Sequence, residues 1–177
     1  NDAHTIYAYG IARALCDAHP EADPSVVLPA ILLHDTGWSQ VPEDLVLRAI
    51  SPTGGGPELV AWHEREGVRI ATAILDEVGT PPGTRDEVVD IISQHDSMKA
   101  AKSLNDALVK DADKLWRLTP HGIDTVMDWF GLTREAAGRL CAWRVHDYLH
   151  TDASRAMARG FGALASVDAW PERVDLG

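Results

Sequence analysis

Apolar residues recur at intervals of three and four along most of the 177-residue chain, and this spacing limits what the chain can fold into. No segment shows the convincing alternation of apolar and polar residues that predicts a half-buried β-strand. We therefore predict an all-α, single-domain protein of about seven to nine helices. The helices are expected near residues 3–18, 24–34, 42–50, 58–78, 84–95, 104–118, 122–130, 134–150 and 153–164.

Several local signals mark the ends of these helices. Asp23 precedes Pro24, a pair typical of a helix start, and Pro29 interrupts the helix that follows. The segment TRDE at residues 84–87 has the form of a capping box, which predicts a helix beginning there and reaching His95. The glycine-rich loop at residues 51–57 is expected to be flexible, as a lid or as a plain connector. Residues 166–177 are expected to form an irregular tail.

Charge and composition exclude some classes of partner. The chain has 16 Lys and Arg against 27 Asp and Glu, a net charge of −11, so duplex nucleic acid is a poor ligand. No apolar run approaches the ~20 residues that span a bilayer, and residues 1–10 lack a secretion-signal pattern. Cys16 and Cys141 fit no metal or redox spacing and are predicted to be buried free thiols, which favours a cytoplasmic protein.

Four histidines lie where apolar side chains are expected. Each shares a helix face with Ala, Val, Leu or Ile at intervals of three and four, or ends an apolar helix. One such histidine is usually a hydrogen-bonded core residue, but four helices that each turn an imidazole inward predict a common partner. A divalent metal accepts several neutral imidazoles at once. The four residues are His4, His34, His63 and His95.

Carboxylates that would complete such a metal site follow the same pattern. Asp35 comes directly after His34, at the end of the apolar run 26–33. The segment KDADKLWRL, residues 110–118, offers Asp111 and Asp113. Helical spacing does not separate these two, so one is predicted to be a ligand and the other a supporting or substrate-contacting group.

These residues together resemble the HD superfamily of metal-dependent phosphohydrolases. The likeness covers residues 4–118 and rests on His4, the His34–Asp35 pair and the later Asp113. In that family the ligand Asp stands just before Lys or Arg, which selects Asp113 over Asp111. The resemblance implies an HD-type helical bundle with its motifs in residues 4–118 and further helices in residues 119–165.

Two more histidines resemble a subset of the family that binds two metals. His63 stands four residues before Gly67, and His95 lies on the next helix. The resemblance implies one or two divalent ions, drawn from Mn, Fe, Co, Ni, Mg or Zn. Asp35 would bridge the ions and orient the attacking water. If no second metal binds, His63 and His95 would contact the substrate or line the cavity.

The implied function is hydrolysis of a small phosphate ester or nucleotide by metal-activated water. Many relatives have Lys after the HD-x-G motif, whereas this chain has Trp38, so the phosphate contacts are assigned to Lys114 and Arg117, with Asp111 as a further substrate contact. Two alternatives stay open. One is a di-iron oxygenase resembling inositol oxygenase, which uses the same ligand series; the other is a metal- or ligand-binding module without catalysis. A homo-oligomer is compatible with either.

Two other His–Asp pairs are given lesser roles. Asp96 follows His95, but one residue along a helix it would point about 100° away, so it is expected to support the site or face solvent. His146–Asp147 lies beyond the motif region and is expected to be structural.

Overall fold

A computed structural model gives the structure of the chain and describes residues 2–51 and 55–168. Every regular element within these ranges is a helix, which confirms the all-α prediction. The α-helices are α1 (Asp2–Ala18), α2 (Pro24–Leu33), α3 (Glu43–Ala49), α4 (Pro57–Glu77), α5 (Pro82–Ile92), α6 (Leu104–Leu115), α7 (Pro120–Phe130), α8 (Arg134–His146) and α9 (Asp152–Asp168). Two short 3-10 helices are η1 (Thr36–Gln40) and η2 (Trp116–Leu118).

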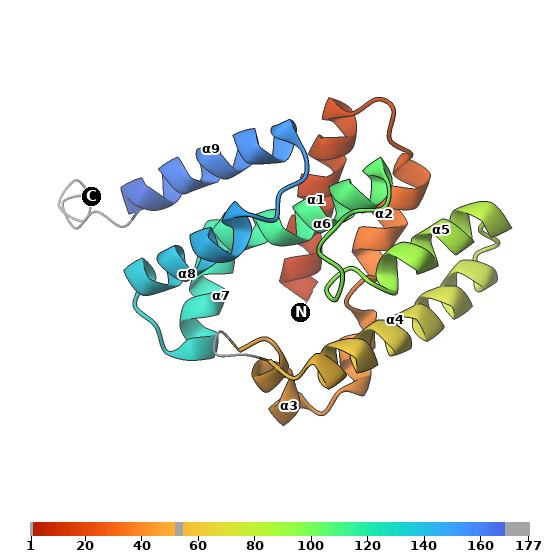
Figure 1. Cartoon of the computed structure of the whole chain (residues 1–177), viewed down its shortest axis with the longest axis horizontal. Coiled ribbons are helices and arrows are strands. Elements are labelled where there is room, and N and C mark those ends of the chain that lie inside the picture. Colours follow the sequence, from red (N-terminus) through yellow and green to blue (C-terminus); the bar gives the residue numbers. More distant parts are fainter. Residues whose placement is uncertain (1, 52–54, 169–177) are drawn as a thin grey trace.

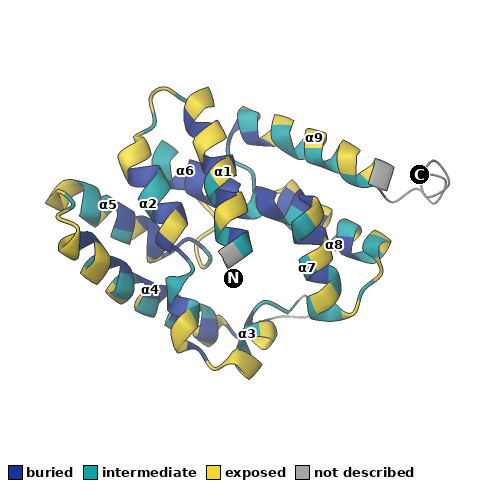
Figure 2. Ribbon diagram, turned by 180° about the vertical axis from the view of Figure 1, so that it is seen from behind, coloured by how far each residue is buried: buried dark blue, intermediate teal, exposed yellow. Residues whose placement is uncertain are grey.

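The apolar helix α2 packs against α1, α5 and α6, and Figure 1 shows it between α1 and α5. Burial of each Val, Leu or Ile side chain stabilises a fold by about 1.5–3 kcal/mol, so the packing of α2 against these three helices contributes much of the stability of the core. Figure 2 shows the buried residues concentrated on these central helices, while exposed residues cover the outer sides of α4 and α9. The buried residues of α2 are Val26, Val27, Ala30, Ile31 and Leu33.

Both ends of α2 are fixed by side chains. Asp23 caps the first turn by accepting a hydrogen bond from the backbone N–H of Ser25 at 2.8 Å, as predicted. At the other end the helix stops at Leu33, whose free carbonyl accepts a hydrogen bond from the Thr36 hydroxyl at 2.7 Å. The chain then turns into η1, so His34 and Asp35 leave the end of a buried helix in a fixed direction.

Gly37 allows η1 to lie directly on the backbone of α4. A Cβ atom added to Gly37 would stand 1.9 Å from the carbonyl oxygen of His63 and 2.5 Å from the amide nitrogen of Gly67. A Cβ on Gly67 would in turn meet the side chain of Ile92 at 3.3 Å. The two glycines therefore let the end of α2, the middle of α4 and the end of α5 approach one another.

Helix α5 differs from the sequence prediction at both ends. It begins at Pro82, before Thr84, and Pro81 at its N-cap position provides no side-chain cap, so the predicted capping box is wrong. Proline suits a first helical turn because its missing N–H has no partner there in any case. The helix ends at Ile92, and residues 93–97 form turns. His95 and Asp96 therefore lie on a turn and not on a helix.

Helices α7, α8 and α9 lie on the opposite side of α6 from α2 and α5 (Figure 1). Helix α8 ends at His146, earlier than expected, and α9 runs to Asp168, so residues 166–168 are helical. The rest of the predicted tail lies outside the described residues, as do residues 52–54 of the glycine-rich loop. One cluster of buried side chains includes residues of α1, α2 and α6 and also of α7 and α8.

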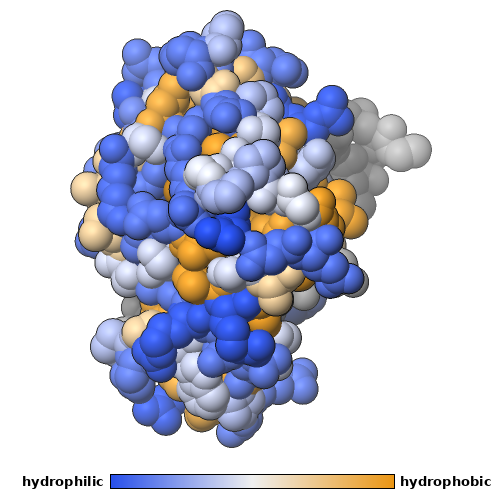
Figure 3. All heavy atoms as spheres, turned by 90° about the vertical axis from the view of Figure 1, so that its right-hand side faces the viewer, coloured by the Kyte–Doolittle hydropathy of each residue, from blue (hydrophilic) through white to orange (hydrophobic). Residues whose placement is uncertain are grey.

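Helix α3 belongs to a second, smaller hydrophobic cluster beside α4. Its buried members are Val41, Ala49 and Leu59, with Trp38 and Trp62 packed against them. Hydrophilic side chains cover most of the face at the α5 end of the molecule (Figure 3). None of the described helices combines the length and the apolar character that a membrane crossing requires. Cys16 and Cys141 are buried free thiols, as predicted.

Candidate metal centre

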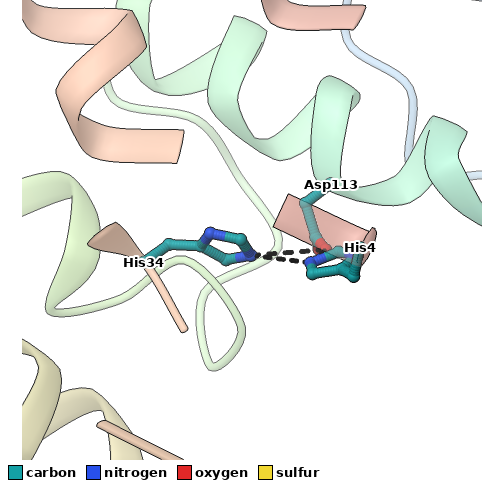
Figure 4. A group of neighbouring side chains, drawn as sticks. All are labelled: His4, His34 and Asp113. Atoms are coloured by element: carbon teal, nitrogen blue, oxygen red, sulfur yellow. Dashed lines mark hydrogen bonds and ion pairs between the residues drawn. The ribbon is translucent and has the colours of Figure 1, made fainter. Parts of the chain in front are cut away.

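His4 on α1, His34 on the turn after α2 and Asp113 on α6 point toward one another (Figure 4). The Nε2 atoms of the two imidazoles are 3.1 Å apart. Oδ1 of Asp113 lies 3.5 Å from Nε2 of His4 and 3.7 Å from Nε2 of His34. All three side chains are buried. We call this group the His4 cluster.

His63, His95 and Asp96 form a second group, the His63 cluster. The Nε2 atoms of His63 and His95 are 3.3 Å apart, and both rings are buried. Oδ2 of Asp96 lies 3.8 Å from Nε2 of His63 and 3.7 Å from Nε2 of His95. Each cluster has ligand atoms close enough together to hold one metal ion.

The carboxylate of Asp35 lies between the two clusters and offers one oxygen to each. Oδ2 is 3.3 Å from Nε2 of His4 and 3.4 Å from Nε2 of His34. Oδ1 is 3.8 Å from Nε2 of His63 and 3.7 Å from Nε2 of His95. A carboxylate with this orientation can bridge two ions, which is the place that the resemblance implied for Asp35.

Backbone carbonyls orient three of the four imidazoles. Nδ1 of His34, His63 and His95 lies 2.7–2.8 Å from the carbonyl oxygen three residues earlier in each case. A carbonyl oxygen only accepts hydrogen bonds, so each Nδ1 carries the proton and donates it. In the neutral ring Nε2 then bears a lone pair, and that lone pair points into the site.

In this tautomer, the short distance between the imidazoles of His63 and His95 indicates that a positive charge belongs between them. With both Nδ1 atoms protonated, the two Nε2 lone pairs face each other at 3.3 Å, which is repulsive unless a positive charge lies between them. A shared proton or a metal ion supplies that charge. The donor set, with four imidazoles and three carboxylates, fits one or two divalent ions of the first transition row.

The charges around the site keep its carboxylates ionised. Burial alone would raise the pKa of Asp113, but Lys114 and Arg117 hold it well below its usual range. Burial also disfavours a charge on His95, yet the carboxylates of Asp96 and Asp35 prevail and raise its pKa to about 9. These two carboxylates therefore favour the protonated form of the His95 imidazole.

Asp96 is a candidate ligand that the sequence prediction missed. The prediction placed it on a helix after His95, pointing away from the site. Because α5 ends at Ile92, His95 and Asp96 lie on a turn, where consecutive side chains can face the same point. Residues 93–97 include no Gly or Pro, so nothing in the sequence signalled that the helix stops early.

Trp38, which stands where many relatives have Lys, supports Asp35 directly. Its indole N–H donates a hydrogen bond to Oδ1 of Asp35 at 3.1 Å. Its ring stacks on the imidazole of His63, with the centroids 3.9 Å apart and the planes 7° from parallel. Trp38 therefore orients one candidate ligand and covers another.

Replacing Trp38 with Phe should weaken metal binding by about tenfold or more, the usual effect of removing a hydrogen bond to a metal ligand. Phe keeps an aromatic ring over His63 but cannot donate to Asp35. Titration of the metal-free protein with Mn²⁺ or Co²⁺ would measure the change. Trp143→Phe, at an exposed position on α8, is the matched control and should bind metal like the original chain. Equal affinities for both variants would show that the Trp38–Asp35 bond is unimportant.

The structure does not bring Asp111 to the site, so the predicted substrate contact is corrected. Its buried carboxylate accepts hydrogen bonds from the backbone N–H groups of His150 and Thr151 and from the hydroxyls of Thr151 and Ser154. Asp111 thus ties α6 to the start of α9. These partners are about 40 residues away in the chain, so helical spacing within residues 110–118 could not identify them.

Lys114 and Arg117 lie at the edge of the site. Nζ of Lys114 is 2.6 Å from Oδ2 of Asp113 and 3.3 Å from Oδ1 of Asp96, so it joins the two clusters electrostatically. Nη1 of Arg117 lies 3.6 Å from Oδ2 of Asp113. By contrast, His146 and Asp147 are exposed, are hydrogen-bonded to each other and lie outside both clusters.

Comparison with known proteins identifies one family. The model of the HD domain matches residues 1–118, two thirds of the chain. The matched segment contains every residue of the His4 and His63 clusters, together with Asp35. No curated protein and no solved structure matches the chain.

Proposed function

This chain belongs to the HD-domain family, and from that membership we propose that it hydrolyses small phosphate esters with the help of two divalent metal ions. HD domains are typically metal-dependent phosphohydrolases. The observation that carries the proposal for this chain is the position of Asp35, whose two oxygens face two separate pairs of imidazoles. Paired ions about 3.5–4 Å apart are common in enzymes that displace a group at phosphorus.

The bound ions would supply an activated water and positive charge beside the phosphoryl group. The chain's own residues would have three tasks. Asp35 would accept a hydrogen bond from the attacking water and hold it in line. Lys114 and Arg117 would contact phosphate oxygens, and their positive charge would balance the charge that develops on them. Trp38 would keep Asp35 in place.

The ligand set also bears on the choice of metal. Four imidazoles favour Mn, Fe, Co, Ni or Zn over Mg, which prefers an environment of oxygen ligands. The bound ions, together with Lys114 and Arg117, would attract a small anion to the site despite the net charge of −11 on the whole chain. A long polyanion would be repelled by the rest of the surface.

The direct test begins with metal-free protein loaded separately with Mn, Co, Ni, Zn, Fe or Mg. We expect release of inorganic phosphate from generic phosphate monoesters with at least one transition metal. The amount of metal needed should approach two ions per chain. Absence of turnover with every ester, together with oxygen uptake by the iron-loaded sample, would favour the oxygenase over the hydrolase. Absence of both activities would leave a binding module.

Replacing Lys114 with Met should lower kcat/KM for a phosphate ester by one to two orders of magnitude, roughly 1.4–2.8 kcal/mol. Met keeps most of the length of the side chain and removes the charge. At saturating metal, the number of ions bound should not change. Lys102→Met is the control, because Lys102 is exposed and pairs with Asp90 away from the site. If the variant instead loses metal, Lys114 acts only by holding Asp113 and Asp96.

A further inference from the structure

A cavity of about 460 Å³ opens beside the metal centre and extends away from it between α3 on one side and α7 and α8 on the other. His4, Asp35, Asp96 and Asp113 line its inner end. Its volume falls in the usual range for a small-molecule site. The part beyond the centre, which we call the apolar chamber, is lined by Val46, Leu47, Ile50, Val126, Trp129 and Leu140.

Two arginines line the same cavity together with these groups. Arg117 is on η2 and Arg144 is on α8, and both also line a neighbouring cavity that reaches His95 and Asp96. Arg117 already has the carboxylate of Asp113 within ion-pair distance. Arg144 donates a hydrogen bond to the carbonyl oxygen of Ile50 at 2.9 Å, which links α8 to the end of α3.

Arg144 differs from the other cations of the site because it forms no ion pair with any described residue, whereas Lys114 and Arg117 each do. Burial and the nearby charge of Arg117 outweigh the opposite effects of Cys141 and Asp96 and lower the pKa of Arg144, as expected for a partly buried cation without an ion-pair partner. A partly buried cation in this state is stabilised by an anion. The guanidinium is also suited to bind two oxygens of one phosphate.

We propose that Arg144, beside Arg117, binds the phosphate of the substrate, and that the apolar chamber binds an apolar alcohol group of the same ester. This inference rests on the proposed function and specifies its substrate class as phosphate monoesters of aliphatic or aromatic alcohols. The arrangement places a phosphate between the two arginines and the metal centre. The alcohol portion then extends toward Leu47 and Leu140.

The chemistry of the chamber favours an apolar group over a nucleoside. Its walls are mainly Val, Leu, Ile and Trp side chains, and Glu43 at the exposed start of α3 is a polar exception. The sugar hydroxyls and base edges of a nucleoside would leave water and find few hydrogen-bond partners, which disfavours their burial. An alkyl or aryl group has no hydrogen bonds to water to lose, and its transfer out of water is favourable.

Binding of alkylphosphonates to the metal-loaded protein tests the chamber without relying on catalysis. Calorimetry should show affinity rising by about two- to fourfold for each added methylene from methyl- to hexylphosphonate, the upper value being that of a fully buried methylene group. Inorganic phosphate serves as the probe of the head-group site alone. Alkyl phosphates of the same chain lengths should show the same trend in kcat/KM.

Two variants separate the head-group site from the chamber. Arg144→Met should weaken binding of inorganic phosphate and of every alkylphosphonate by a similar factor, about tenfold or more, and leave the dependence on chain length unchanged. Arg144→Lys keeps the charge and should recover part of the affinity. Leu47→Gln, at a half-exposed position, should lower affinity for hexylphosphonate by about fivefold and leave methylphosphonate unaffected.

Matched controls are Arg139→Met, an exposed arginine on α8, and Leu32→Gln, an exposed leucine outside the cavity. Neither should change any of these affinities. Thermal melting and metal content would show that each variant is folded and loaded.

The outcomes distinguish this inference from the proposed function. Hydrolysis of esters without any dependence on chain length, or a preference for nucleoside monophosphates over alkyl phosphates, would overturn the chamber and leave the hydrolase in place. Binding that strengthens with chain length and depends on Arg144, but without hydrolysis of any ester, would support the chamber and reject the hydrolase. Unchanged phosphate binding in Arg144→Met would reject the role of Arg144.

Discussion

Asp35→Asn should remove metal from both clusters at once and abolish activity, with kcat/KM falling by at least about a thousandfold, or roughly 4 kcal/mol. Asp35 faces all four imidazoles, two through each oxygen. Asn has the same shape but no charge, so the positive charge of two ions would lack the negative group between them. Elemental analysis after dialysis would measure metal per chain, and circular dichroism would show that the helices remain.

Two comparisons make this result specific. Asp44→Asn, at an exposed position in the first turn of α3, should keep both ions and full activity. His63→Gln should lose the ion of the His63 cluster first, since the His4 cluster keeps its own ligands. If Asp35→Asn retains two ions per chain, Asp35 does not bridge, and the proposed function loses its main support.

Gly37→Ala should destabilise the protein by about 3 kcal/mol or more, at the upper end of what overpacking usually does. The added Cβ would collide with three backbone atoms of α4: the carbonyl oxygen of His63 at 1.9 Å, its carbonyl carbon at 2.8 Å and the nitrogen of Gly67 at 2.5 Å. Backbone atoms cannot move aside by a change of rotamer, so η1 and α4 must separate. That movement would also carry His63 away from Asp35 and weaken metal binding.

Gly10→Ala is the matched control because it makes the same chemical change inside α1. Apart from the adjoining backbone of α1 itself, no heavy atom lies within 4 Å of the Cβ that it adds, so the better helix propensity of Ala should stabilise the protein by about 0.5–1 kcal/mol. Urea unfolding of both metal-free variants would give the two free energies. Equal stabilities for the two variants would contradict the tight packing of η1 on α4.

The sequence by itself determined the all-α fold and the inward direction of His4 and His63, which lie within α1 and α4. Both follow from apolar spacing, which is local information: a helix face that must be buried carries its polar residues inward with it. His34 and His95 are also buried, but they lie on turns that follow α2 and α5. The cap at Asp23 was predicted from the Asp–Pro pair that opens α2, whereas the helix ends at residue 33, one residue before the expected end. The resemblance then selected Asp113, where periodicity alone left Asp111 and Asp113 equal.

Only the tertiary structure decided the positions of Asp111, Asp96 and Arg144. Asp111 bonds to Thr151 and Ser154, about 40 residues further along the chain. Asp96 faces the site because α5 stops at Ile92, whose side chain lies close to Gly67 of α4. Arg144 acquires its position from a contact with Ile50, 94 residues away. Helical periodicity indicates which face of one helix is buried. It does not indicate which residues of other helices that face contacts, because those contacts depend on how helices distant in the sequence pack together.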